Sequence, residues 1–143
     1  MRSRPTPSLP VLALRVAVAI LLGIHGYHRA FSGGVAPFGA YLEGANFPFA
    51  LVTAWALTVF EMVGSLFLLF GQLVRWVIPG FVLILAIGIV MVHASNGWFV
   101  VGAGRNGVEY SVLLIVCLGV LFASHTRDYD SPGRDGLSRG LQF

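Results

Sequence analysis

Residues 48–70 read PFALVTAWALTVFEMVGSLFLLF, and Glu61 is the one charged residue among them. A helix needs about 20 predominantly apolar residues to cross the hydrocarbon core of a bilayer. This run therefore predicts a membrane-spanning helix. A strand is disfavoured, because lipid offers no water to satisfy the open edges of a sheet.

Further apolar runs lie on both sides of this one, separated by turn-rich segments. Gly71 and Gln72 form a tight turn, which predicts that the helices on either side are antiparallel neighbours. The segment 32–47 is rich in glycine and aromatic residues, and we expect it at the membrane interface or as a re-entrant segment. The pattern predicts an all-α integral membrane four-helix bundle, with helices at 10–31, 48–70, 73–94 and 107–124 in a domain of residues 1–126, then a polar cytoplasmic tail at 127–143.

The composition of the chain agrees with a lipid environment. Of 143 residues, 57% are hydrophobic and 10% are charged, and the mean hydropathy is +0.83. An average globular domain carries about 25% charged residues. The nine cations are all arginine and are spread along the chain, without the basic stripe that nucleic-acid binding requires. We expect the lipid bilayer, and no nucleic acid, as a partner.

The distribution of arginine predicts the orientation of the chain. No small-x-small cleavage site follows the first apolar run, so we expect this run to be retained as a helix. With the N-terminus inside, both termini are cytoplasmic and arginine is in excess on the inner side, as the positive-inside rule requires. The inner arginines are then Arg2, Arg4, Arg75, Arg127, Arg134 and Arg139, and the outer ones are Arg29 and Arg105.

Two ionisable residues are predicted to lie inside the membrane. Such a residue costs about 2.5–3.5 kcal/mol on insertion scales, so each needs a partner or a use. Glu61 lies nine residues before the end of its run, and Arg15 lies five residues after Pro10. These depths predict an Arg15–Glu61 ion pair between two helices. The pair either fixes helix register, or its carboxylate handles protons or contacts a quinone oxygen.

A second group of polar residues lies near the outer ends of three predicted helices. His25, His28 and Arg29 share one helix face through their i, i+3 and i+4 spacing. One such residue alone is typical of a membrane interface, whereas several at one depth are typical of a binding site. The candidate outer-side site comprises His25, His28, Arg29, His93, Arg105, Asn106, Glu109 and Tyr110.

The sequence gives little support for a metal or a haem. It contains no cysteine pair, no HExxH and no His-x-x-x-His, so we predict no metal site. His25 and His93 meet only the minimum requirement for two axial haem ligands, and we disfavour haem. The single cysteine, Cys117, lies in an apolar run, which indicates packing and excludes a dithiol pair within this chain.

Three stretches match the motifs of one known family. They are HGYHRAF at 25–31, with Arg29 where lysine is usual; EMVG at 61–64 through LLFG at 68–71 to Arg75; and His93 with NGWF at 96–99 and NGVEYS at 106–111. Over residues 12–123 the chain resembles the DoxX family of small membrane proteins.

The resemblance implies a four-helix bundle in the bacterial cytoplasmic (inner) membrane and a link to membrane redox metabolism. Family members are described as small subunits of quinol oxidases or thiosulfate–quinone oxidoreductases. Another belongs to a complex with a superoxide dismutase and a sulfurtransferase. We therefore expect an accessory, non-catalytic subunit that binds a quinone or partner oxidoreductase subunits. Its polar interior would comprise Arg15, Glu61, His25, His93 and Glu109.

Two alternatives remain open. A structural or assembly protein without a cofactor predicts that changes at Arg15 and Glu61 damage folding, while changes in the outer group do little. A small carrier or proton-conducting homo-oligomer requires discontinuous helices in paired repeats. Pro79-Gly80 is the single break that the sequence indicates, so we rank this alternative last.

Overall fold

The chain is entirely helical in the part that the structure describes. This computed structural model covers residues 7–102 and 105–130, with side chains to residue 126. The helices are α1 (Leu9–Phe31), α2 (Val35–Gly44), α3 (Ala50–Leu69), α4 (Val74–Gly88) and α5 (Glu109–Asp130). A π-helical turn at Ile89–His93 and a 3-10 turn at Ala94–Asn96 extend α4. The all-α prediction is confirmed.

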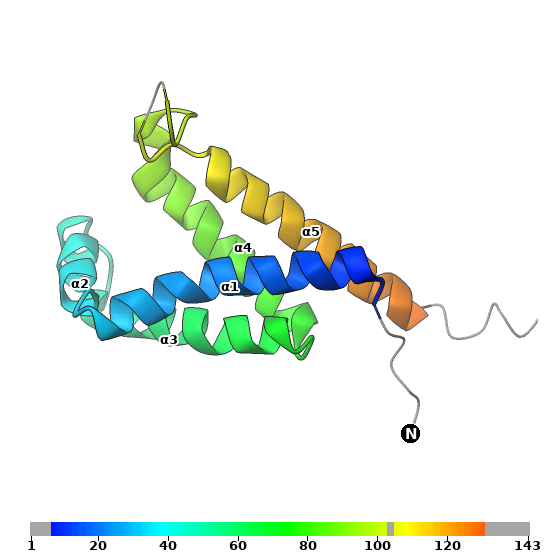
Figure 1. Cartoon of the computed structure of the whole chain (residues 1–143). Helices are drawn as coiled ribbons and strands as arrows, with labels where there is room; N and C mark the ends of the chain where they lie inside the picture. The colour runs from blue at the N-terminus through cyan, green and yellow to red at the C-terminus, as the bar shows by residue number, and fades with distance from the viewer. Residues whose placement is uncertain (1–6, 103–104, 131–143) are drawn as a thin grey trace, which may run out of the picture.

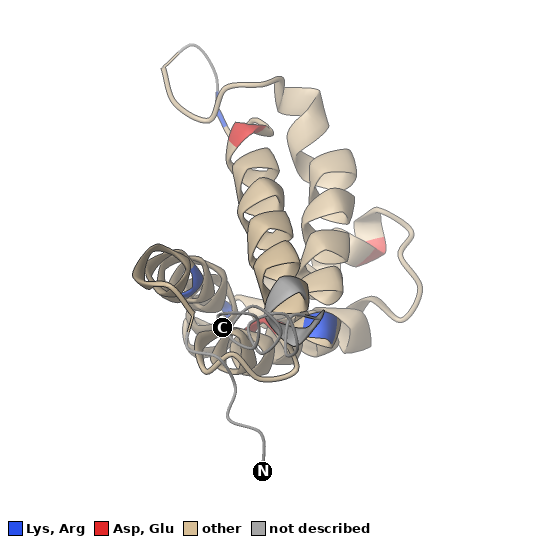
Figure 2. Ribbon diagram, turned by 90° about the vertical axis from the view of Figure 1, so that its right-hand side faces the viewer, with Lys and Arg blue, Asp and Glu red and all other residues tan. Residues whose placement is uncertain are grey.

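In the described part of the chain, four helical segments are long and apolar enough to cross a membrane. They are Leu9–Phe31, Ala50–Leu69, Val74–Asn96 and Glu109–Thr126. Large apolar side chains on these segments face outward, such as Trp76 and Val90, which are 80% and 77% exposed. In a bilayer these faces contact lipid. Few residues of the helices carry charge (Figure 2).

The four spans form two antiparallel pairs. α1 and α3 run side by side (Figure 1). α2 packs against α3 at the far end of this pair, where α1 finishes and α3 begins (Figure 1). α4 and α5 form the second pair, which is inclined to the first (Figure 1). Tyr41 of α2 joins the two pairs at their far ends, because its hydroxyl donates a hydrogen bond to the Met91 carbonyl oxygen at 3.0 Å.

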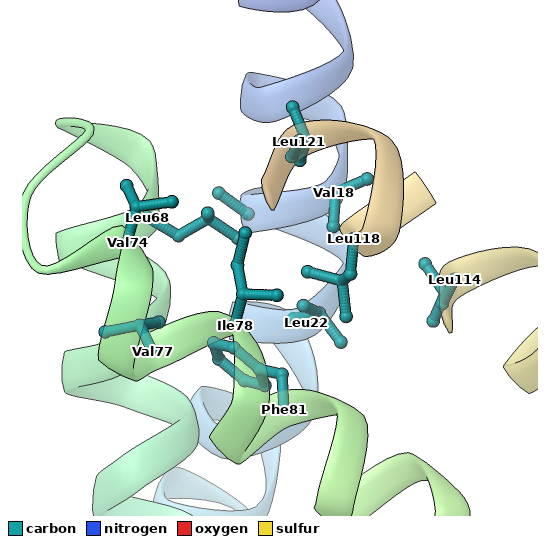
Figure 3. Close-up of a cluster of buried hydrophobic side chains, with 11 residues drawn as sticks. Val18, Leu22, Leu68, Val74, Val77, Ile78, Phe81, Leu114, Leu118 and Leu121 are labelled. Carbon is teal, nitrogen blue, oxygen red and sulfur yellow. The ribbon is translucent and has the colours of Figure 1, made fainter. Parts of the chain in front are cut away.

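The main hydrophobic core lies where the two pairs meet, and all four spans contribute to it (Figure 3). A smaller cluster at the far end holds α2 onto α3 through Val35, Leu42 and Ala54. The main core consists of Val18, Ala19 and Leu22 from α1, Leu68 from α3, Val74, Val77, Ile78 and Phe81 from α4, and Leu114, Leu118 and Leu121 from α5.

Several elements differ from their predicted extent. α2 occupies the segment for which only an interfacial or re-entrant path was predicted. α5 continues to Asp130, beyond the predicted end at residue 124, because a helix needs no apolar residues once it leaves the membrane. α4 continues as a helix through Pro79, and a π-helical turn follows it at Ile89–His93. The remainder of the predicted tail, 131–143, lies outside the described residues.

Candidate functional site

α1 and α3 approach each other closely through small residues of α1. A Cβ added at Gly26 would lie 2.8 Å from Glu61 Cβ and 3.0 Å from the Thr58 carbonyl oxygen. A Cβ added at Gly23 would lie 2.7 Å from Ser65 Oγ. The missing Cβ atoms therefore let the two backbones come together, as small residues do between membrane helices. This approach sets Glu61 level with Gly26.

Glu61 is paired with Arg29 across this contact. Arg29 Nη1 donates to Glu61 Oε2 at 2.9 Å, and the two side chains are 20% and 10% exposed, respectively. Side chains on a helix tilt toward its N-terminus. Because α1 and α3 are antiparallel, Arg29 and Glu61 tilt toward each other and meet between the levels of their own Cα atoms.

Two further residues hold the Arg29 guanidinium in place. Its Nη1 also donates to Thr58 Oγ1 at 3.2 Å, and the fully buried Thr58 hydroxyl donates to the Ala54 carbonyl oxygen at 2.7 Å. The Phe38 ring of α2 lies over the guanidinium, with 4.4 Å from Arg29 Cζ to the ring centroid. A cation over an aromatic face is attracted to the ring quadrupole. One guanidinium thus joins α1, α2 and α3.

The carboxylate of the ion pair lies near the middle of α3, and the guanidinium comes from the last turn of α1. Glu61 is eleven residues after the start of α3 at Ala50 and eight before its end at Leu69. At 1.5 Å per residue, these separations are about 16 Å and about 12 Å. The carboxylate is therefore deep in the hydrocarbon layer if α3 crosses it, where an unpaired charge is costly. Within the described chain, Glu61 Oε1 makes no hydrogen bond, so it can accept a proton or a ligand's donor.

The predicted Arg15–Glu61 pair is wrong, and helix register is the reason. A Cβ added at Gly71 would lie 2.5 Å from Arg15 Nη1, so Arg15 is level with the α3–α4 turn. Gly71 follows Glu61 by ten residues, or about 15 Å along a helix. Arg15 also tilts toward the N-terminus of α1, away from Glu61. The prediction treated the start of α1 and the end of α3 as level. In the structure, the first residues of α1, from Leu9 to Arg15, extend past the end of α3.

The structure brings three members of the predicted outer group together in the α4–α5 connection. His93 Nδ1 lies 2.8 Å from the Asn106 carbonyl oxygen, and Glu109 Oε1 accepts a hydrogen bond from the Val100 amide at 2.9 Å. The Glu109 amide in turn donates to the Trp98 carbonyl oxygen at 3.1 Å. In this structure the side chains of His93 and Glu109 and the Asn106 carbonyl group stabilise the conformation of this connection.

The other members of the outer group are dispersed. His25 and His28 are exposed on α1, and His28 Nδ1 lies 3.5 Å from Ser32 Oγ. Arg105 is exposed in the loop, whereas Tyr110 packs against the main hydrophobic core. Arg29 belongs with Glu61 instead. The predicted single site therefore separates into a pair inside the membrane, a loop network and exposed residues.

Thr58 and Phe38 are site residues that the sequence prediction missed. Thr58 precedes Glu61 by three residues, so i, i+3 spacing alone places it on the same helix face, and this signal was available. Phe38 gave no such signal, because its contact with Arg29 depends on how α2 folds back. The prediction also placed Arg29 and Glu61 in separate groups.

An open apolar groove of ≈ 440 Å³ lies between α3 and α4. It is on a different side of α3 from the ion pair: a Cβ added at Gly64, which lines the groove, would meet Phe81 of α4, whereas Glu61 faces α1. In the described part of the chain, no group of three or more His, Cys, Asp or Glu residues is arranged to hold a metal ion. The groove is lined by Ala56, Val59, Phe60, Val63, Gly64, Phe67, Leu73, Trp76 and Val77.

Comparison with known proteins matches the chain to a family model described as DoxX, over residues 11–94. This range is more than half of the 143 residues. It contains Arg29, Thr58 and Glu61, and it ends before the segment from Asn106 to Glu109. No curated protein and no solved structure gives a match.

Proposed function

The chain belongs to the DoxX family, and we propose that it is an accessory subunit of a quinone-linked oxidoreductase in the bacterial cytoplasmic membrane, with both termini in the cytoplasm. The observation that carries the proposal is the Arg29–Glu61 pair, at 2.9 Å, which joins the last turn of α1 to the middle of α3. A carboxylate at the depth of Glu61 is costly, and such residues commonly mark substrate or proton paths. Partner oxidoreductase subunits would supply the electron transfer.

The two charged groups have complementary chemistry. Arg29 is always protonated and donates only, so it can orient a carbonyl oxygen. Glu61 can take up or release a proton through Oε1, which has no hydrogen-bond partner in the described chain. A bound quinone would carry the electrons and protons. The protein would position it and hold a proton at the carboxylate.

A structural or assembly role is the competing candidate, and the same residues favour it. Arg29 contacts Thr58, Glu61 and Phe38, so one side chain fixes the arrangement of α1, α2 and α3. Removing one partner of a buried ion pair is strongly destabilising. This role predicts that loss of the Glu61 charge reduces the amount of folded protein or assembled complex, with activity falling in proportion.

A substitution that keeps the shape of Glu61 separates the two roles. We would introduce Glu61→Gln and compare quinone-linked respiration of native membranes with the amount of protein and of assembled complex. Gln can still accept a hydrogen bond from Arg29 but cannot hold the proton. Glu43→Gln is the matched control, because Glu43 is exposed on α2, away from the ion pair.

The proposal predicts that quinone-linked activity per assembled complex falls by about a hundredfold or more in Glu61→Gln, the low end of general acid–base effects. Protein level stays near that of the parent, and the Glu43→Gln control stays active. An activity loss fully explained by a lower level of protein or complex would establish the assembly role instead. Unchanged activity and unchanged stability would remove any role for the Glu61 charge.

A further inference from the structure

Arg15 is a partly buried cation that has no anionic partner among the described residues. It makes no ion pair and no hydrogen bond with the residues that the structure describes, and its Nε is buried without a hydrogen-bond partner. Glu61, the predicted partner of Arg15, instead forms an ion pair with Arg29. A guanidinium has five donors and a permanent charge, so shielding it from water without a partner is unfavourable. Among the described residues, the guanidinium therefore has no acceptor.

The depth of Arg15 in the membrane indicates which part of the bilayer could supply an acceptor. The guanidinium lies against Gly71, two residues after the end of α3. α3 has 20 residues, which span about 30 Å, the thickness of the hydrocarbon core. The α3–α4 turn therefore lies at the boundary of that core. Phosphate groups of the lipids are at this level.

The charges of this end of the molecule also favour an anion. Arg75 is exposed on the first turn of α4, four residues after Gly71. The carboxylates with described side chains lie elsewhere: Glu61 in mid-span, Glu43 on α2, and Glu109 at the start of α5. None of these three carboxylates neutralises Arg15 or Arg75, the two arginines beside the α3–α4 turn (the turn arginines).

The apolar groove begins at the same turn. Leu73 and Trp76 line it, and they flank Arg75 in the sequence. The groove then follows α3 and α4 past Phe67 and Phe60. We propose that Arg15 and Arg75 bind the phosphate of an anionic phospholipid whose acyl chain lies in this groove. A free phosphate ion would use the arginines but not the groove.

Native mass spectrometry of the purified full chain in mild detergent tests the proposal. The chain would be titrated with phosphatidylglycerol and with phosphatidylcholine, each with and without excess glycerol phosphate. Arg15→Gln removes the buried cation, and Arg75→Gln removes an exposed one that cannot disturb the core. Ala56→Phe fills the groove. Arg105→Gln is the matched control, because Arg105 is an exposed arginine in the α4–α5 connection, away from the turn.

The proposal predicts that the parent binds phosphatidylglycerol more tightly than phosphatidylcholine. Each turn arginine should contribute about fivefold to affinity, the value expected for a basic residue near an anionic surface. Ala56→Phe should also weaken binding, and Arg105→Gln should not. Equal binding of both lipids, or no change in either turn variant, would overturn it. Full displacement by glycerol phosphate with no effect of Ala56→Phe would mean a soluble phosphate site, which also overturns it.

Discussion

At the residue scale, the direction in which side chains tilt decides which charges meet. Arg29 and Glu61 lie on antiparallel helices and tilt toward each other, whereas Arg15 tilts toward the α3–α4 turn. The sequence alone predicted that Glu61 needs a buried partner, because its depth follows from hydropathy. It could not identify the partner, because the relative height of two helices depends on where Gly23 and Gly26 let them touch.

Thr58 provides a direct test of how Arg29 is held. Thr58→Val keeps the branched shape and removes two hydrogen bonds, one from Arg29 and one to the Ala54 carbonyl oxygen. We expect the free energy of unfolding to fall by about 1–2 kcal/mol, measured by denaturant titration in detergent micelles. Thr53→Val is the control, because its hydroxyl donates to the Pro48 carbonyl oxygen at the exposed start of α3. An equal loss in both variants would contradict a specific role for Thr58.

At the element scale, the contact between α1 and α3 depends on glycine. In Gly26→Ala the new Cβ would meet Glu61 Cβ at 2.8 Å and the Met62 amide nitrogen at 3.0 Å. Because backbone cannot rotate aside, α1 must shift. We expect a loss of about 1–3 kcal/mol in the free energy of unfolding, as in overpacked cores. The shift also moves Arg29 away from Glu61.

The control for this substitution lies on α5. Gly119→Ala places its Cβ in open space, with no neighbouring atom within 4 Å. Alanine favours helix more than glycine does, so we expect unchanged or slightly higher stability, measured by the same titration. A neutral Gly26→Ala variant would show that α1 and α3 do not approach as closely as described.

The spans could be predicted from the sequence, but two other elements could not. Hydropathy identifies the four spans because crossing a membrane requires a long apolar run. α2 has only ten residues, with Pro37 and Gly39 among them, and a short helix of this kind gives no such signal. The π-helical turn at Ile89–His93 depends on local backbone geometry and contacts such as the hydrogen bond from Tyr41.

At the scale of the whole molecule, two helix pairs share one core, and polar groups are distributed among three levels. Arg15 lies at the α3–α4 turn, the Arg29–Glu61 pair joins the last turn of α1 to the middle of α3, and the His93 and Glu109 network lies in the α4–α5 connection. Similar predicted depth suggested that the outer residues form one site. Depth alone does not determine contact, because residues on different helices can face away from one another.

The central claim is that Glu61 is paired with Arg29 and not with Arg15. The most direct measurement is a pair of double-mutant cycles on the free energy of unfolding, combining Glu61→Gln with Arg29→Gln and with Arg15→Gln. We predict a coupling of about 1–3 kcal/mol between Glu61 and Arg29, and a coupling within about 0.5 kcal/mol of zero between Glu61 and Arg15. A coupling concentrated in the Arg15 cycle, or none in the Arg29 cycle, would contradict the arrangement of α1 against α3 described above.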